Sequence, residues 1–316
     1  MAPRHDPEQA RLEQILARLQ PSLGPRVSEP VALSGGITNH NFHVTLSSGD
    51  YVIRLHGKDT ELLGIDREAE RMAGSLAAEL GIAPELITAL EDCLVTRFVA
   101  CEPLAPPLLA AHVEELARAL RSFHDSAAVL PARFWVPDLL AAYAAIVHRR
   151  GAGLPSSYAE ARAVAGQVAA ALPLRSARPC HNDLLPGNLI RSREQEQILI
   201  VDWEYAGMGD PYFDLGNLSV NNDFSEADDE RLLNAYHRRP PTDGQRATLA
   251  LMRILSDARE AAWGVLQAEI SERDFDFNRY ARVHFERLHA AVAQPHLQEW
   301  LAAAASERRE HDGKAT

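Results

Sequence analysis

Apolar residues recur three or four positions apart in several stretches of the chain, which is the spacing of one face of a helix. Residues 10–19 show this pattern and Pro21 follows them, so they predict a short opening helix. Residues 66–80 repeat the pattern and stop at Gly81, a residue type that commonly ends helices. Residues 110–123 are rich in Leu and Ala and predict a helix packed inside a larger lobe.

Short apolar runs in the first hundred residues predict strands. These runs cover residues 31–33, 41–46, 51–57 and 93–99, and residues 41–46 also alternate apolar and polar positions. A Pro-rich passage at residues 102–107 then separates this strand-rich part from a mostly helical remainder. The pattern therefore predicts an α+β fold with two lobes.

The chain divides accordingly into four parts. Residues 1–32 form a helical extension, residues 33–100 form a small N-terminal lobe, and residues 101–305 form the larger lobe. The polar stretch 306–316 is predicted to be a disordered tail.

Composition narrows the class of protein. The 316 residues are 46% hydrophobic but contain no apolar run near the ~18 residues that a membrane-spanning helix needs, so we expect no membrane insertion. Residues 1–8 lack the apolar core of a secretory signal. The three cysteines cannot form a disulfide framework and fit a reducing compartment, so we expect a cytoplasmic protein.

The net charge of −12 argues against a nucleic-acid partner or an anionic membrane surface. Many proteins are acidic for solubility alone, so the charge favours a cationic substrate only weakly. No oligomeric state follows from the sequence.

The clearest candidate chemistry lies between Asp183 and Asp202. An apolar pair after Asn188 leads into a polar turn at residues 192–197, and a second apolar run returns directly to Asp202, which predicts a β-hairpin. If its strands pair antiparallel, Asn188 and Asp202 lie nearly opposite each other at the open end. Oxygen ligands of this kind hold Mg²⁺ against nucleotide phosphates, and a separate Asp takes the proton of a substrate hydroxyl. The alternative is an ordinary hairpin after an Asp-rich turn.

These residues resemble the kinase-like phosphotransferases, the superfamily of the aminoglycoside phosphotransferases and the choline/ethanolamine kinases. The catalytic loop of that superfamily reads His-x-Asp-x-x-x-x-Asn, as His181, Asp183 and Asn188 do here, and its metal-binding Asp follows on the next strand, as Asp202 does. The resemblance implies a protein-kinase-like fold that binds ATP between its lobes. It also implies Mg²⁺ held by Asn188 and Asp202, with Asp183, Asn188 and Asp202 as the catalytic residues and Asp183 as the base.

A Gly-rich turn between two predicted strands is the candidate cover for the nucleotide phosphates. It contains Ser34, Gly35, Gly36 and Asn39. Glycine lets backbone N–H groups approach phosphate oxygens, although most Gly-Gly hairpin turns are only turns. The turn lies where the resembling kinases carry their phosphate-binding loop.

Further nucleotide contacts follow from the same resemblance. Choline kinases use Arg where most kinases use Lys on a strand, and Arg54 matches that position with a bidentate fork for phosphate. Glu70 matches the helix Glu that pairs with this cation, and Glu68 is its competitor. Backbone groups of Arg97 and Val99 would meet adenine where the chain enters the larger lobe.

The residues after Asp202 bear on the substrate. Glu204 and Tyr205 stand where choline kinases carry Glu and Tyr, and the segment around Trp263 resembles their C-terminal helical region. Aromatic side chains there bind a quaternary ammonium by cation–π contact, so Tyr205 and Trp263 are candidates for that wall. Trp263 also fits an ordinary core position. Eukaryotic choline kinases have a second Trp where this chain has Glu260.

We therefore expect an ATP-dependent kinase, with Asp183, Glu204, Tyr205 and Trp263 at a site for choline, ethanolamine or a similar small cationic alcohol. The alternatives are a kinase of another small alcohol, such as an aminoglycoside, thiamine or a sugar-like compound, and a nucleotide-binding pseudokinase with an interaction role. All the catalytic groups are present, which argues against the pseudokinase.

Two further polar residues are expected to be structural. His124 follows a predicted helix, where a capping role is commoner than a catalytic one. Asp214 precedes another predicted helix and would either cap it or, as the resemblance implies, brace the catalytic loop from beneath.

Overall fold

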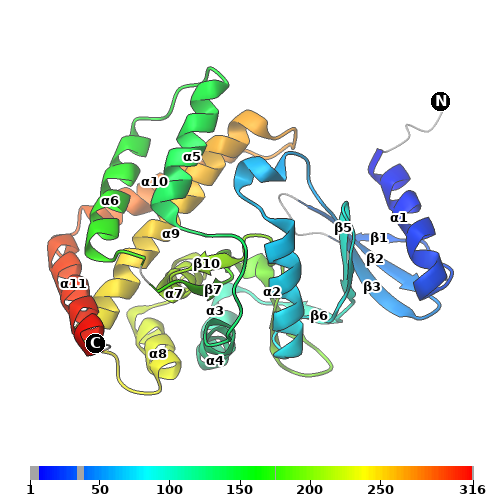
Figure 1. Cartoon of the computed structure of the whole chain (residues 1–316), viewed down its shortest axis with the longest axis horizontal. Coiled ribbons are helices and arrows are strands. Elements are labelled where there is room, and N and C mark those ends of the chain that lie inside the picture. The colour runs from blue at the N-terminus through cyan, green and yellow to red at the C-terminus, as the bar shows by residue number, and fades with distance from the viewer. Residues whose placement is uncertain (1–6, 34–38, 175, 315–316) are drawn as a thin grey trace.

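The computed structural model describes residues 7–33, 39–174 and 176–314. Its larger sheet lies in a small N-terminal lobe, and most of its helices lie in a second, larger lobe (Figure 1). The predicted α+β fold, with a strand-rich small lobe and a mostly helical remainder, is therefore confirmed.

A five-stranded antiparallel sheet in the order β1-β2-β3-β5-β4 forms the small lobe. Its strands are β1 Val31–Leu33, β2 His40–Leu46, β3 Gly49–Leu55, β4 Leu86–Ala89 and β5 Cys93–Arg97. Strands β2 and β3 pair over their whole length, from His40 opposite Leu55 to Leu46 opposite Gly49. Alternate residues of β2, such as Val44, are buried, as the period of two in the sequence predicts.

Helix α1 (Pro7–Leu23) covers one face of this sheet. Its buried residues Leu12 and Ile15 pack in one cluster with Val44 and Ile53 of the strands. The helix is longer than the sequence predicted and includes Pro21, which lies in the last turn and removes only one backbone hydrogen bond there. The predicted N-terminal extension thus contributes to the core of the small lobe.

Helix α2 (Arg67–Glu79) follows the short 3₁₀ helix η1 (Thr60–Leu63) and begins at its N-cap Asp66. The Asp66 carboxylate accepts hydrogen bonds of 2.9 Å from the backbone N–H groups of Glu68 and Ala69. Such caps are worth about 1 kcal/mol. The cap fixes the first turn of α2, which carries Glu70 inward.

The predicted hairpin is present at the junction of the lobes. Strands β8 (Leu189–Ser192) and β9 (Ile198–Ile200) pair antiparallel, and β6 (Cys101–Pro103) adds a third strand. The Val201 N–H donates to the Asn188 carbonyl at 2.9 Å, so Asn188 and Asp202 flank the open end of the hairpin. A separate pair, β7 (Arg178–Cys180) with β10 (Gly207–Gly209), brackets the catalytic loop.

The larger lobe is helical and is built around α9, a helix of 28 residues. Its helices are α3 Pro106–Ala110, α4 Val113–His124, α5 Val136–Arg149, α6 Ser157–Ala171, α7 Pro211–Asn221, α8 Glu226–His237, α9 Asp243–Ile270, α10 Phe277–Val292 and α11 Leu297–Lys314. Helix α9 packs against α5, α7, α10 and α11, which explains why it is buried along most of its length.

Two stretches differ from the sequence expectation. The helix predicted at residues 110–123 is present as α4 but begins later, at Val113, since Ala110 ends the separate helix α3. Residues 306–314, assigned to a disordered tail, continue helix α11. In the part of the chain that the structure describes, every helix is too short or too polar to cross a membrane.

A close crossing of α7 over α9 gives a stability prediction. A Cβ at Gly216 would lie 2.7 Å from the backbone carbon of Met252 and 2.8 Å from the backbone nitrogen of Arg253, and backbone cannot move aside as a side chain can. We expect Gly216→Ala to lower the free energy of unfolding by about 1–3 kcal/mol, measured by urea denaturation. The control is Gly166→Ala on α6, where a Cβ meets nothing within 4 Å. That exchange should add about 0.5–1 kcal/mol, and equal effects of the two variants would refute the argument.

Candidate active site

The catalytic loop between β7 and β8 is held from beneath by Asp214. One oxygen of this carboxylate accepts the His181 N–H at 2.8 Å, and the other accepts the Asn182 N–H at 2.7 Å. The His124 ring nitrogen Nε2 also contacts Asp214, at 2.9 Å. Asp214 lies within α7, whose N-cap is Asp210, so the capping alternative is wrong. Both Asp214 and His124 are structural, as expected.

His181 joins the catalytic loop to the hairpin. Its Nδ1 accepts the Asp183 N–H at 3.1 Å, and its Nε2 lies 3.1 Å from the Val201 carbonyl. Burial lowers the pKa of His181 to about 4, so the ring is neutral. A neutral ring with its proton on Nε2 satisfies both contacts at once, and this places Asp183 beside the hairpin mouth.

Asp183 lies at the centre of the site and is buried. The Asn188 amide donates to the Asp183 carbonyl at 2.7 Å and to its carboxylate at 3.0 Å. From the other side, Arg259 Nη1 donates to the remaining carboxylate oxygen at 3.0 Å. Burial raises the pKa of Asp183 to about 8, while Arg259 opposes the rise and Glu260 adds to it. These contacts hold the carboxylate in one orientation.

Asn188 and Asp202, the predicted metal ligands, are brought together at the hairpin mouth. Asp202 adopts a left-handed backbone conformation, with φ of 64°, which turns the chain sharply after β9. Burial raises the pKa of Asp202 to about 6, with Arg54 opposing and Glu204 adding to the rise. A carboxylate in this setting gains from a nearby cation.

Arg54 on β3 reaches the same place from the small lobe. Its guanidinium pairs with Glu70 of α2 and with Asp202, and it is almost fully buried. Glu68, the competitor of Glu70, points outward and pairs with Arg71. Residues two apart on a helix lie on opposite faces, so only one of these glutamates can meet Arg54.

Glu204 lies with the nucleotide-side residues in the structure, although the sequence grouped it with the substrate. Its Oε2 accepts a 2.9 Å hydrogen bond from Asn39 and lies 3.6 Å from Arg67. Arg67 in turn bonds Glu70 at 2.7 Å. Asn39 and Glu204 therefore tie the start of β2 to the hairpin side of the site.

The structure describes only some of the other residues predicted to contact the nucleotide. Ser34, Gly35 and Gly36 lie outside the described residues. The Arg97 N–H is already bonded to the Glu85 carbonyl at 2.8 Å, so at Arg97 only the backbone carbonyl remains to meet adenine. The Arg97 side chain pairs with Glu85 and covers the Tyr51 ring at 4.9 Å. Val99 lies between β5 and β6, where the chain passes between the lobes.

Arg259 of α9 is a candidate functional residue that the sequence interpretation missed. It is only 1% exposed, contacts Asp183, and bonds Glu260 at 2.8 Å. Its guanidinium carbon lies 4.3 Å from the centre of the Tyr205 ring. The available signal was an Arg-Glu pair inside the Ala-rich stretch that ends at Trp263, because charges at buried helix positions need partners.

Tyr205 and Trp263 do come together on the α9 side of Asp183. The Trp263 ring N–H donates to the Tyr205 hydroxyl at 2.9 Å. The Glu260 carboxylate accepts hydrogen bonds of 2.8 Å from the Tyr280 hydroxyl and from Arg259. The centres of the Trp263 and Tyr280 rings are 5.5 Å apart. Glu260 is therefore engaged by the chain's own side chains.

The charges around the hairpin mouth fit a divalent cation. Five carboxyl groups stand against three guanidinium groups, which leaves two negative charges when all five are ionised, the state that a bound cation favours. The carboxyl groups belong to Glu70, Asp183, Asp202, Glu204 and Glu260, and the guanidinium groups belong to Arg54, Arg67 and Arg259. Carboxylate and amide oxygens are the ligands that Mg²⁺ takes in proteins, so Asn188 and Asp202 could hold it.

A second group of metal-ligand types, His124, Cys180 and Asp214, is better explained as structure. Their ligand atoms all lie within 4.8 Å of one another. However, both oxygens of Asp214 already accept backbone N–H groups. Burial raises the pKa of the Cys180 thiol, which keeps it protonated and a poor ligand.

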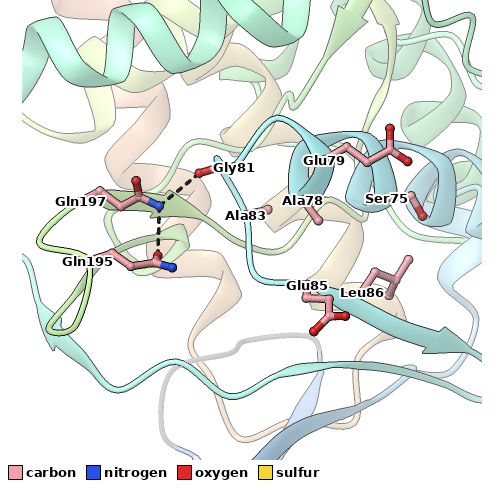
Figure 2. A pocket seen from close by; sticks show the side chains of 9 residues that line it. All are labelled: Ser75, Ala78, Glu79, Gly81, Ala83, Glu85, Leu86, Gln195 and Gln197. Carbon is pink, nitrogen blue, oxygen red and sulfur yellow. Dashed lines mark hydrogen bonds between the residues drawn. The ribbon is translucent and has the colours of Figure 1, made fainter.

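A surface hollow beside α2 is separate from this site (Figure 2). Gln197 crosses one side of it, donating to the Gly81 carbonyl at 3.1 Å and to Gln195 at 3.0 Å. Among the predicted site residues that the structure describes, none lines it. The buried charged groups, and not this hollow, identify the candidate active site.

Comparisons with known proteins identify the family of this chain. A family model described as "Phosphotransferase enzyme family" matches residues 29–255. The solved structure of a choline/ethanolamine kinase family protein from Mesorhizobium loti is 30% identical, with a TM-score of 0.79, and the match covers 93% of this chain and 99% of that one.

Curated relatives are more distant. Protein LicA from Haemophilus influenzae is 25% identical over 215 residues, and the match spans 66% of this chain but only 63% of LicA. Human ethanolamine kinase 1 is 26% identical over 317 residues, with 86% of this chain and 69% of that protein covered.

Proposed function

Because this chain belongs to the phosphotransferase enzyme family, in its choline/ethanolamine kinase group, we propose that it moves the γ-phosphoryl group of ATP to the hydroxyl of choline, ethanolamine or a similar small alcohol. The observation that carries the proposal is the convergence of Asp183, Asn188 and Asp202 at one hairpin mouth, beside the Arg54–Glu70 pair. This arrangement offers a base, ligands for a metal ion and a cation for the phosphates, which phosphoryl transfer uses.

The small lobe would hold the nucleotide. Arg54 presents a planar fork suited to two phosphate oxygens, and Glu70 fixes the direction of that fork from α2. Asn188 and Asp202 would hold Mg²⁺, which neutralises charge on the phosphates during transfer. Asp202, which would hold Mg²⁺, contacts Arg54, which would hold the phosphates. The two side chains are therefore positioned relative to each other before either ligand binds.

The larger lobe would present the acceptor. Asp183 is fixed by Asn188 and Arg259, so its carboxylate can orient an incoming hydroxyl and take its proton as the oxygen attacks phosphorus. His181 and Asp214 hold the loop in place, so little reorganisation is needed at the moment of reaction.

A turnover assay tests this function. Purified protein with ATP and Mg²⁺ should release ADP only when an acceptor is added from a panel of choline, ethanolamine, thiamine and an aminoglycoside. Removal of Mg²⁺ with EDTA should stop the reaction. Asp202→Asn should do the same because an amide replaces the one carboxylate among the two metal ligands.

The alternatives predict other outcomes. Turnover on thiamine or the aminoglycoside alone would keep the kinase and change the substrate. Tight ATP binding without turnover on any alcohol would support a nucleotide-binding pseudokinase and overturn the proposal.

A further inference from the structure

Arg259 carries hydrogen-bond donors that the described part of the chain leaves unused. Its side chain is 1% exposed, and only Nη1 is bonded, to Asp183 and Glu260. Within the residues that the structure describes, the buried nitrogens Nε and Nη2 meet no hydrogen-bond acceptor. Buried donors without partners are rare because each is costly, so this guanidinium points to an acceptor atom supplied by a ligand.

The position of these donors fits the acceptor substrate. Arg259 contacts the carboxylate that is proposed to act as the base, because its Nη1 lies 3.0 Å from Asp183 Oδ1. A hydroxyl oriented by Asp183 would therefore lie close to the guanidinium. A second oxygen near that hydroxyl is within reach of the unused N–H groups.

The Arg259 side chain already contacts the aromatic ring and the carboxylate that would otherwise bind a cationic substrate. The guanidinium stacks on the Tyr205 ring at 4.3 Å and pairs with Glu260 at 2.8 Å. Glu260 is further bonded by Tyr280 at 2.8 Å. A quaternary ammonium in this place would meet an aromatic face and a carboxylate that already hold a positive charge, and like charges repel strongly in a buried site.

We propose that Arg259 is a specificity-determining residue, and that the preferred acceptor is a small alcohol with a second oxygen, a carboxylate or a hydroxyl, beside the reacting hydroxyl. This inference rests on the proposed function and narrows its substrate class. The second oxygen accepts hydrogen bonds from Nε or Nη2 of Arg259, and this contact discriminates against choline.

The chemical step is the ordinary kinase reaction. The acceptor oxygen forms a bond to the γ-phosphorus, the bond from that phosphorus to the β,γ-bridging oxygen breaks, and ADP leaves. The acceptor proton passes to Asp183. Arg259 exchanges no proton in this step; it holds the second oxygen and keeps the Asp183 carboxylate in its orientation.

The test compares acceptors that differ in the group beside the hydroxyl: glycerate, glycerol, ethanolamine and choline. With ATP and Mg²⁺, kcat/KM for glycerate or glycerol should exceed that for choline by at least about 10-fold, because one hydrogen bond to a charged group is worth about 10- to 100-fold. Arg259→Gln should remove this preference. The matched control is Arg246→Gln on the same helix, whose guanidinium pairs with Glu230 and Asp243 at the surface.

A second variant controls for misfolding, because Arg259→Gln alone removes one of the two hydrogen-bond partners of the buried Glu260. The double variant Arg259→Gln with Glu260→Gln removes both buried charges and should show the same loss of preference. Binding is measured in parallel, as the shift in unfolding temperature that each acceptor causes in the presence of ADP and Mg²⁺.

The outcomes separate this inference from the proposed function. Preferred turnover of choline by the unaltered protein, or an unchanged preference in both Arg259 variants, overturns the inference and leaves the kinase intact. Stabilisation by glycerate or glycerol that depends on Arg259, without any turnover, supports the oxygen site and refutes the kinase. No stabilisation and no turnover with either oxygen-bearing acceptor overturns the inference.

Discussion

The variant Asp183→Asn is expected to lower kcat by about 10²- to 10⁴-fold, which is the usual contribution of a general base. Asparagine keeps the shape of the side chain and can still accept a hydrogen bond from Arg259, so the fold should remain. What it loses is the capacity to take the proton of the acceptor hydroxyl. ADP release with the best acceptor of the wild-type protein measures the effect, and thermal unfolding verifies that the variant is folded.

The control for this variant makes the same chemical change at an exposed site. Asp59 is exposed and has a φ of 54°, a conformation that Asn tolerates well, so Asp59→Asn should leave kcat unchanged. Turnover of Asp183→Asn within about threefold of wild type would remove Asp183 from the mechanism, since a general base contributes at least about 10²-fold.

Asp214→Ala should have the second large effect, on stability and activity together. The exchange leaves three buried donors without an acceptor: the N–H groups of His181 and Asn182 and the ring nitrogen of His124. At about 1–3 kcal/mol for each of the three buried donors left unpaired, the free energy of unfolding should fall by roughly 3–9 kcal/mol. Urea denaturation measures the loss.

Activity should fall in the same variant even at temperatures where it is folded. Asn182 adopts a φ of 68°, and the hydrogen bond from its N–H to Asp214 holds that conformation. Without this bond the following residue, Asp183, loses its fixed direction. The control is Asp210→Ala, which removes the N-cap of α7 and a 3.6 Å contact with Arg308 but no bond to the catalytic loop, and it should cost about 1 kcal/mol. Similar losses in the two variants would contradict the bracing role of Asp214.

The parts of the site that the sequence predicted well are local along the chain. Asn188 and Asp202 are joined by one hairpin, and the alternation of apolar residues fixes where its strands begin and end. The family that residues 180–205 suggested is confirmed by the family match over residues 29–255. Short sequence separations and a strict period leave few arrangements open.

Contacts across long separations were not predictable in this way. Arg259 lies 76 positions from Asp183, and the two meet only because α9 packs against α7 beneath the catalytic loop. Such packing depends on the volumes of many side chains and has no period in the sequence.

Backbone conformation explains the remaining difference, at Glu204. Simple continuation of β9 would place alternate residues on alternate faces. The left-handed conformation of Asp202 breaks that alternation, and the chain turns so that Glu204 meets Asn39 while Tyr205 meets Arg259. Neighbouring residues thereby serve opposite sides of the site.

The packing of α1 determines how long a segment of this chain must be to fold by itself. The match to the family begins at residue 29, after α1 has ended at Leu23. Yet Leu12 and Ile15 of α1 are fully buried against the small-lobe sheet, and each such side chain contributes about 1.5–3 kcal/mol. A chain that began at residue 29 would expose a wide apolar sheet face and should associate with other copies of itself. The part that folds alone therefore includes helix α1, although the family model does not match it.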